Sequence, residues 1–371
     1  MRIGLLSCCF AAMVFVCAAT AAPAATRFVS PSGSDSGNCT LTPCRTISYA
    51  VAQASAGDLV SVASGTYAES VSIGKRLWVM GANATLDATG QDHGFVIAGP
   101  AAAGTLLQGF TVENAGLEGI FARQTSRLAI VGNRVVNNDA YGVFSPQCSF
   151  SPDDCGEALH LQTVTQSLVS GNLVQNNVGG ILLTDEDGPT SGNLIVRNRV
   201  LDNTKDCGIT LASHAFHLGA PVTADAGGVY RNQVLHNISD GNGAADSGIF
   251  AGPPGAAAWG NVVVGNSASN NGLPGVAIHS HTPFQYVNDN VVVNNTLSDN
   301  GPDDDAGTGQ PAGIVVFSDT AHGAAPIPHT TVASNTIRNE YYGVFASGAT
   351  KVSGLPSNHF ADSVTVPTSI H

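Results

Sequence analysis

The chain has 371 residues, of which 43 are glycine; 43% of the residues are hydrophobic and only 11% are charged. Lys and Arg number 14 against 27 Asp and Glu, which gives a formal net charge of −13. This composition excludes a disordered chain and a coiled coil, and the lack of a basic stripe argues against a nucleic-acid partner. An acidic protein can still bind an acidic polysaccharide through a local cluster of Lys, Arg and His, or through bridging Ca²⁺.

Residues 1–25 are typical of a secretory signal peptide. Arg2 precedes an apolar run from Ile3 to Ala22, and small residues follow it, so cleavage is expected near Ala25. A membrane anchor is the alternative, because about twenty apolar residues can span a bilayer. The Ala, Cys and Ser content favours cleavage. We therefore expect a secreted or periplasmic protein without a membrane span after cleavage.

The cysteines agree with export. Five remain after the signal, and four of them form close pairs, Cys39 with Cys44 and Cys148 with Cys155. Each pair is predicted to close a short loop as a disulfide in an oxidising compartment. Cys207 is the odd cysteine and is expected as a buried thiol. Metal binding by these residues is the weaker alternative, because no Cys-x-x-Cys pair is present.

A repeated turn is the dominant pattern in the sequence. Its form is Asn, any residue, an apolar residue, two further residues and usually a second Asn, followed by a glycine and a β-branched residue. The leading asparagines are Asn133, Asn172, Asn198, Asn232, Asn266, Asn295 and Asn335. We expect the Asn and Gly positions to supply the backbone conformations with φ > 0 that β-branched residues resist.

Such a unit cannot bury its apolar face alone, so the repeats must stack. Stacked units would pair every strand with the coils above and below and would align the asparagines in ladders. This predicts a parallel β-helix. Leucine-rich and helical repeats are the alternatives for units of this length, and the missing helical periodicity argues against both.

The pattern, which covers about residues 105–350, resembles the right-handed parallel β-helix proteins of the pectate-lyase-like superfamily. Residues 46–57 are expected to form a short amphipathic helix ending at Gly57, and residues 58–67 a strand and turn. These segments are similar to the cap helix and first coil of that superfamily. The predicted organisation is a signal peptide (1–25), an N-terminal cap (26–57), the β-helix (58–350) and a C-terminal tail or cap (351–371).

Alternation along the strands sorts side chains into inward and outward positions. The inward set is expected to be Ile120, Ile181, Ile209, Ile249, Val276 and Ile314, and their outward neighbours to be Phe121, Leu182, Thr210, Phe250, Ala277 and Val315. Two residues further along, a second outward column is expected to hold Arg123, Thr184, Ala212, Gly252, His279 and Phe317. The distance to Asn172 places His160 and Gln162 in these two columns. Polar insertions on both sides of the strand predict a groove that could hold an extended polymer.

For a uronic-acid polymer, β-elimination requires neutralisation of the carboxylate, a base that removes the α-proton and an acid that assists the leaving oxygen. The candidate catalytic residues are His160, Lys205, His214 and His279. The candidate substrate-binding residues are Arg123, as a carboxylate clamp, with Gln162, Thr210 and His281.

Asp185, Glu186 and Asp187 are candidate ligands for Ca²⁺, with a solvated acidic loop as the alternative reading; the same choice applies to Asp303–Asp305. The His279-x-His281 pair could bind a transition metal, but the sequence offers no third ligand nearby.

The family's usual motifs are missing. The chain lacks the Trp-x-Asp-His, Arg-Ile-Lys, Gly-His-Gly and Asp-Pro-His elements of pectate lyases, polygalacturonases and alginate epimerases, so no catalytic role transfers residue by residue. The resemblance implies a carbohydrate ligand and leaves the reaction open.

The prediction is a monomeric lyase of acidic glycans such as pectate or alginate, with C5-epimerisation sharing the proton-abstraction step. Hydrolysis by the carboxyl groups of Asp185, Asp187 or Asp206 stays formally open. The rival is a non-catalytic carbohydrate-binding or surface-structural protein, favoured by outward Phe121, Leu182, Phe250 and Phe317.

Overall fold

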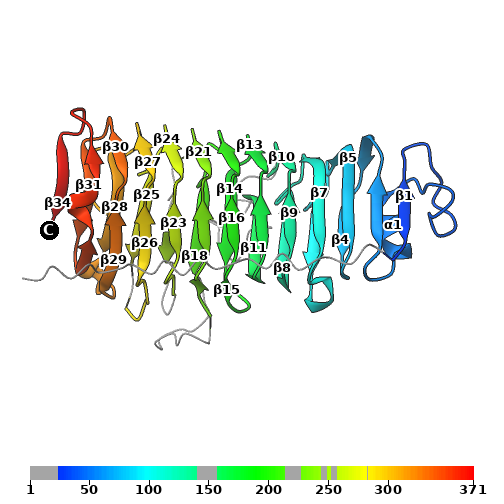
Figure 1. Ribbon diagram of the computed structural model, residues 1–371, viewed down its shortest axis with the longest axis horizontal. Coiled ribbons are helices and arrows are strands. Elements are labelled where there is room, and N and C mark those ends of the chain that lie inside the picture. The colour runs from blue at the N-terminus through cyan, green and yellow to red at the C-terminus, as the bar shows by residue number, and fades with distance from the viewer. Residues whose placement is uncertain (1–23, 140–156, 214–226, 244–248, 252–256, 282) are drawn as a thin grey trace, which may run out of the picture.

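The computed structural model describes residues 24–139, 157–213, 227–243, 249–251, 257–281 and 283–371. These residues form an elongated stack of coils that begins at β1 and α1 and ends at β34 (Figure 1). Each coil contributes short strands that pair in parallel with the coils before and after it. The predicted parallel β-helix is confirmed.

Within the described residues, a 21-stranded sheet contains two columns of strands. The two columns form one sheet because β5 (Trp78–Asp87) and β7 (Leu106–Glu113) are long enough to run through both of them. The first column also contains β1 (Thr26–Val29), β2 (Leu59–Val62), β9 (Ala129–Val131), β12 (Leu168–Ser170), β16 (Leu194–Val196), β20 (Gln233–Leu235), β23 (Val262–Val264), β26 (Asn290–Val293), β29 (Ile327–Ala333) and β32 (Thr350–Ser353). The second also contains β3 (Gly65–Ala68), β10 (Arg134–Val136), β13 (Leu173–Gln175), β17 (Arg199–Leu201), β21 (Ile238–Asp240), β24 (Ser267–Ser269), β27 (Thr296–Ser298), β30 (Thr336–Arg338) and β33 (His359–Phe360).

Among the described residues, a 13-stranded sheet forms the third column of strands. Its members are β4 (Val71–Ile73), β6 (Phe95–Ala98), β8 (Ile120–Ser126), β11 (Glu157–Thr165), β14 (Gly179–Thr184), β18 (Ile209–Ser213), β22 (Ile249–Ala251), β25 (Val276–Ser280), β28 (Ala312–Ser318), β31 (Tyr342–Ser347) and β34 (Val366–Ile370), with β15 (Thr190–Ser191) and β19 (Val229–Tyr230) beside them. The described residues also contain three short 3-10 helices between strands, η1 (Pro100–Ala102), η3 (Thr320–His322) and η4 (Leu355–Ser357).

One apolar core runs through the stack. The residues predicted to point inward from the third column are buried in it, as shown by Ile120, Ile181, Ile209, Val276 and Ile314. Because each coil fills the core with only a few Val, Ile or Leu side chains, a coil is stabilised mainly by its neighbours. The pattern of alternation in the sequence therefore located the core correctly.

Asparagine ladders occupy all three corners between the columns. In each ladder the side-chain oxygen of one Asn accepts from the backbone N–H of the Asn in the preceding coil, as between Asn172 and Asn198 at 3.0 Å. The first corner holds Asn133, Asn172, Asn198, Asn237, Asn266, Asn295, Asn335 and Asn358. The second holds Asn138, Asn177, Asn203, Asn242, Asn271, Asn300 and Glu340, and the third holds Asn193, Asn232, Asn261 and Asn290. Buried amides are thus satisfied from coil to coil.

Two details of the predicted repeat are wrong. Asn232 does not continue the first ladder; it belongs to the third corner, and Asn237 takes its expected place. Asparagines recur every five residues around one coil, so the sequence alone does not distinguish one corner from the next. The positive φ angles belong to the residues directly before the ladder asparagines and not to those asparagines themselves; many of these residues are Gly or Asn, such as Gly132 at 61° and Asn137 at 55°, but Arg197 at 56° is neither.

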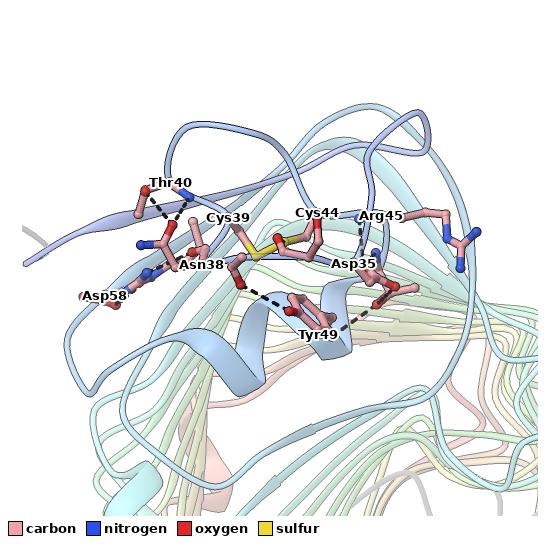
Figure 2. The surroundings of a disulfide bond; sticks show 12 residues. Asp35, Asn38, Cys39, Thr40, Cys44, Arg45, Tyr49 and Asp58 are labelled. Carbon is pink, nitrogen blue, oxygen red and sulfur yellow. Dashed lines mark hydrogen bonds and ion pairs between the residues drawn. A yellow bond between two sulfur atoms is a disulfide. The ribbon is translucent and has the colours of Figure 1, made fainter.

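The N-terminal end of the core is covered by α1 (Ile47–Gln53), which is shorter than the predicted helix. Thr46 caps this helix by accepting from the Tyr49 backbone N–H at 3.2 Å, and Ile47 packs into the core. The disulfide between Cys39 and Cys44 is confirmed, and Figure 2 shows it in the loop beside α1. The Tyr49 hydroxyl donates to the Gly37 carbonyl at 3.2 Å and so connects the helix to that loop.

The strand ladder extends beyond the predicted limits at both ends. β1 already pairs with β2, so the stack begins within the predicted cap. Residues 351–371 form a further coil, in which β33 pairs with β30 and β34 pairs with β31. Cys207 is buried, as predicted, whereas the predicted pair Cys148 and Cys155 and the predicted signal peptide lie outside the described residues, apart from Ala24 and Ala25. No helix in the described part of the chain is long and apolar enough to cross a membrane.

Candidate functional site

The outer face of the 13-stranded sheet is only partly open. Leu182, Ala277 and Val315, which were predicted to point outward, are buried at 1% exposure or less. Over the C-terminal part of the sheet, the loop of residues 301–311 covers this face, because Ala306 packs with Val315. The predicted groove is therefore closed over Ala277 and Val315, whereas outward side chains of β6 and β8, among them Phe121 and Arg123, remain accessible.

The register of β22 also differs from the prediction. Ile249 is level with Leu211 and Ile278, which moves Phe250 into register with Ala212. Phe250 thus stands in the column predicted for Gly252. The sequence placed β22 two residues out of register, because the Gly-Ile signal that opens the other strands falls later in this coil.

A buried carboxylate, Glu118, joins two histidines on this accessible part of the face. His93 Nδ1 lies 2.7 Å from Glu118 Oε2, and His160 Nδ1 lies 3.4 Å from Glu118 Oε1. The ring of Phe121 lies between the two imidazoles, with its centroid 5.2 Å from each. The strand register explains this meeting, because His93 and Glu118 both stand two residues before the paired Phe95 and Ile120.

Glu118 is ionised in this setting. Burial opposes its ionisation, but hydrogen bonds from His160 and His93 lower the pKa of Glu118 to about 2. An ionised carboxylate can only accept, so a proton on the facing nitrogens is favoured. His93 Nδ1 and Glu118 Oε2 are in close ion-pair contact at 2.7 Å without hydrogen-bond geometry, whereas His160 Nδ1 is hydrogen-bonded to Oε1.

His160 has a hydrogen-bond partner at each of its nitrogens. Its Nδ1 contacts Glu118 Oε1, and its Nε2 lies 2.8 Å from Thr184 Oγ1, whose hydroxyl donates to Glu186. With 5% of its surface exposed, His160 is better suited to hold Glu118 in place than to take a proton from a bound polymer.

His93 is the accessible member of the cluster. A quarter of its side chain is exposed, while its Nδ1 is buried against Glu118. The exposed part of the ring therefore does not include Nδ1, and in the Nδ1–H tautomer the lone pair of a neutral His93 lies on Nε2. A carboxylate that orients an imidazole in this way leaves the outer nitrogen available as a base.

The sequence analysis missed both His93 and Glu118. The signal was present, because each stands directly before the glycine that opens a strand, in His93-Gly94-Phe95 and in Glu118-Gly119-Ile120. Residues at that position on successive coils become neighbours. The predicted outward columns include only residues that follow the glycine, so they do not include His93 and Glu118.

The predicted placement of Gln162 in the column of Arg123, two residues beyond His160 and Phe121, is confirmed. Gln162 is paired in register with Arg123 on β8 and with Thr184 on β14. Arg123 is exposed and Gln162 is half-buried. Together they line the second outward column one alternation away from Phe121 and His160.

The other predicted residues lie elsewhere. Lys205 is exposed in the turn before β18, and Thr210 is buried two strands from His160 in the same column. His214 lies outside the described residues. His279 and His281 are on β25 and directly after it, four strands beyond β11, or about 19 Å along the stack at about 4.8 Å per strand. His160 and His279 therefore belong to two separate clusters.

The acidic triplet does not converge on one point. Asp185 is buried and accepts from the Ser213 hydroxyl at 2.8 Å and from the Gly228 backbone N–H. Glu186 accepts from Thr184, and exposed Asp187 accepts from Gln124 Nε2 at 3.0 Å. Asp185 thus ties β14 to the coil that follows it, and the Ca²⁺ site at these residues stays a prediction.

Comparisons with known proteins agree on the fold. Residues 89–218, just over a third of the chain, match the family model described as periplasmic copper-binding protein (NosD). No curated protein sequence matches the chain significantly. Within the described part of residues 89–218, no three His, Cys, Asp or Glu side chains bring their donor atoms together as a metal site would require.

Solved structures similar to this chain are parallel β-helices. The A-module of the Azotobacter vinelandii mannuronan C-5 epimerase AlgE6 is 14% identical, with a TM-score of 0.54 over 87% of this chain and 89% of that one. The Dettilon tailspike protein is 16% identical (TM-score 0.57; 87% and 63% covered), and the catalytic domain of an α-1,3-glucanase is 12% identical (TM-score 0.52; 88% and 64% covered). The chain is a right-handed parallel β-helix with the pectate-lyase-like fold.

Proposed function

We propose that this protein is exported and cleaves an acidic polysaccharide by β-elimination on the outer face of β6, β8 and β11. The observation that carries the proposal is the buried Glu118 in contact with the accessible His93, on the same face of the sheet as exposed Arg123. The fold supports a polysaccharide ligand in general terms, because structures with the same fold include a mannuronan epimerase and a glucanase. The matched family is described as periplasmic, which supports export.

In the proposed reaction, Arg123 pairs with the uronate carboxylate and Gln162 donates to it or to a ring hydroxyl. Neutralising that carboxylate acidifies the proton on the adjacent carbon. His93 Nε2 takes this proton, a carbon–carbon double bond forms, and the bond to the leaving glycosidic oxygen breaks. The proton on His93 can then pass to the leaving oxygen, so that the imidazole returns to its starting state.

Glu118 and His160 act as positioning residues in this scheme. The Glu118 carboxylate holds His93 in the tautomer with Nδ1–H and stabilises the imidazolium that forms, in the way that carboxylates orient catalytic histidines elsewhere. His160 keeps Glu118 ionised and fixed from the opposite side. C5-epimerisation would share the first step and return a proton to the opposite face of the same carbon.

The test is a panel of polyuronates, assayed for the ultraviolet absorbance of unsaturated uronate products. We expect product from at least one polymer, loss of product in His93→Gln, and unchanged product in His329→Gln. His329 is an exposed histidine close to Asp289, at 3.7 Å, and is a matched control for loss of a His–Asp contact. Full activity of His93→Gln would contradict the proposed base.

Carbohydrate binding without cleavage is the second candidate, and a different observation favours it. Tyr230 and Trp259 stack face to face with centroids 4.7 Å apart and an interplanar angle of 9°, and Arg231 lies over Trp259 at 4.8 Å. Tyr286, which is 42% exposed, continues this strip on the next coil. Aromatic rings of this kind suit stacking against sugar rings. Measurable glycan binding that is lost in Tyr286→Ala, with no product from any polymer, would favour this function.

A further inference from the structure

A second histidine cluster lies at the C-terminal end of β25. His279 is completely buried, and its Nδ1 faces His281 Nε2 at 3.2 Å. His281 Nε2 in turn lies 4.0 Å from Asp305 Oδ2, which belongs to the loop of residues 301–311. That loop supplies the third ligand that the sequence analysis could not find near the His-x-His pair.

The orientation of His279 is fixed by Asp303. Its Nε2 lies 2.7 Å from Asp303 Oδ2, while Asp303 Oδ1 accepts from the Ala306 backbone N–H at 2.9 Å. Since the carboxylate accepts, His279 donates Nε2–H to it, and the lone pair of a neutral His279 lies on Nδ1, facing His281. A carboxylate bound to the outer nitrogen of an imidazole is the usual support for a metal-ligating histidine.

We propose that His279, His281 and Asp305 bind a divalent transition-metal ion such as Zn²⁺ or Cu²⁺. Imidazole nitrogens lie about 2.0–2.1 Å from such ions, so two nitrogens on one ion are about 2.9–3.4 Å apart for angles between 90° and 109°. The observed 3.2 Å falls within this range. The donor atoms of all three residues lie within 4.8 Å of one another, and Asp305, at 67% side-chain exposure, is free to turn toward the ion.

The surroundings favour a cation with nitrogen preference. Asp303 and Asp319 add negative charge near the two imidazoles, and the Phe317 ring packs edge to face against His279 and His281, at 5.7 and 6.0 Å. Two imidazoles with one carboxylate suit zinc and copper better than Ca²⁺ or Mg²⁺. Three protein ligands leave at least one coordination position open to water or to an external ligand.

The proposal is independent of the proposed polysaccharide cleavage. The cluster lies about 19 Å along the stack from His160, by four strand spacings of about 4.8 Å. It also lies beyond residue 218, where the match to the copper-binding family model ends. Its failure would leave the His93 site untouched, and the reverse also holds.

The test uses the full mature chain, purified without a polyhistidine tag and stripped of metal, and titrates it separately with Zn²⁺ and Cu²⁺ by calorimetry. We expect one ion per chain with a Kd on the order of 1 μM or tighter. His281→Ala should weaken binding at least about 100-fold, and Asp305→Ala about 10-fold or more, while His329→Ala should leave it unchanged. Asp303→Asn, which alters the support of His279, should weaken binding about 10- to 100-fold.

Electron paramagnetic resonance of the Cu²⁺ complex reports directly on the ligands of the ion. Substitution of a residue that only supports the fold would leave this spectrum unchanged. We expect hyperfine splitting from two imidazole nitrogens in the unaltered chain and from one in His281→Ala. Circular dichroism of each variant checks that the coils persist. Equal affinity and an unchanged spectrum in His281→Ala and Asp305→Ala, or no ion bound at micromolar concentration, would overturn the proposal.

Discussion

Buried polar side chains are organised in two different ways in this molecule. At the corners, the same residue type recurs on every coil, and each asparagine makes the same hydrogen bonds to the next, as Asn172, Asn198 and Asn237 do. On the outer face of the 13-stranded sheet, buried polar groups change from coil to coil. There Glu118 joins two histidines, whereas His279 pairs with Asp303.

The difference separates structural from functional polar groups. A side chain that repeats on every coil satisfies a need that every coil has, namely pairing of the corner amides. A buried charged group that occurs once satisfies no such general need, and placing it there costs desolvation free energy. The unrepeated groups are therefore the better candidates for chemistry.

The largest expected effect is on activity at the unrepeated site. His93→Ala should lower kcat/KM on the polyuronate that is cleaved by about 10²- to 10⁴-fold, because general-base catalysis contributes about that much. Because the substitution also removes the imidazole that faces the buried Glu118 carboxylate, the free energy of unfolding should fall by roughly 1–3 kcal/mol. Steady-state kinetics together with urea unfolding measure both. A large loss of stability in His93→Ala with its activity retained would show that His93 is a structural residue and not a catalytic one.

The opposite result is expected at a corner. Asn198→Ala removes the acceptor of two bonds from Asn172 and two donated bonds, to the Val169 carbonyl at 3.0 Å and to Asn237 Oδ1 at 3.0 Å. Leaving these buried partners unsatisfied should lower the free energy of unfolding by roughly 3–5 kcal/mol. Gln175→Ala is the matched control, because Gln175 lies on β13 and donates to Asp202 on the next coil in an exposed contact at 3.2 Å. Equal effects from the two substitutions, measured by urea unfolding, would show that the ladder is not special.

Glu340 is a charged residue within a ladder, because it replaces the last asparagine of the second ladder. Its Oε1 accepts from the Asn300 backbone and side chain, and its Oε2 has no hydrogen-bond partner among the described residues. Burial raises the pKa of Glu340 to about 7 from the ordinary 4.5, against the effect of the bonds from Asn300. The folded state thus holds a proton that the unfolded chain releases, so this residue's contribution to stability falls as pH rises from about 4.5 to 7.

Glu340→Gln should therefore stabilise the protein at pH 8 by up to about 2 kcal/mol and flatten that part of the pH profile.

Glu118 should give the reverse trend, because its pKa lies at about 2 in the folded state, below its ordinary 4.5. Its contribution is present above pH 4.5 and is lost as pH falls toward 2. Thermal unfolding between pH 2 and pH 8, with Glu340→Gln and Glu118→Gln compared, measures both signs. No change of slope near neutral pH in Glu340→Gln would contradict the account of the ladder end.

The smallest effect is expected at the cap. Cys39 and Cys44 close a loop of only a few residues, with a sequence separation of 5, so the double change to Ser should cost about 2 kcal/mol or less. The loss should be confined to the end of the stack that contains α1. Hydrogen exchange measures this, and faster exchange in the central coils as well would show that the cap controls the whole core.

The sequence was sufficient for what repeats. The strand alternation identified the inward Ile120 and Ile181, and the recurrent asparagines identified the ladders, apart from the shift at Asn232. The sequence was insufficient for the polar clusters that occur only once in the stack. His93 meets Glu118, and His281 meets Asp305, only through the register of coils separated by about 25 residues. Because the insertions vary in length, the sequence also did not show that the loop of residues 301–311 covers Val315 or that Phe250 is in register with Ala212.

The most direct test of the central claim is a crystal structure of the His93→Gln variant with an uncleaved acidic oligosaccharide. The account predicts that the sugar chain crosses β6, β8 and β11 on the outer face, with one carboxylate on the Arg123 guanidinium and its ring against residue 93. A sugar chain bound instead along Tyr230, Trp259 and Tyr286, or on the 21-stranded sheet, would contradict it.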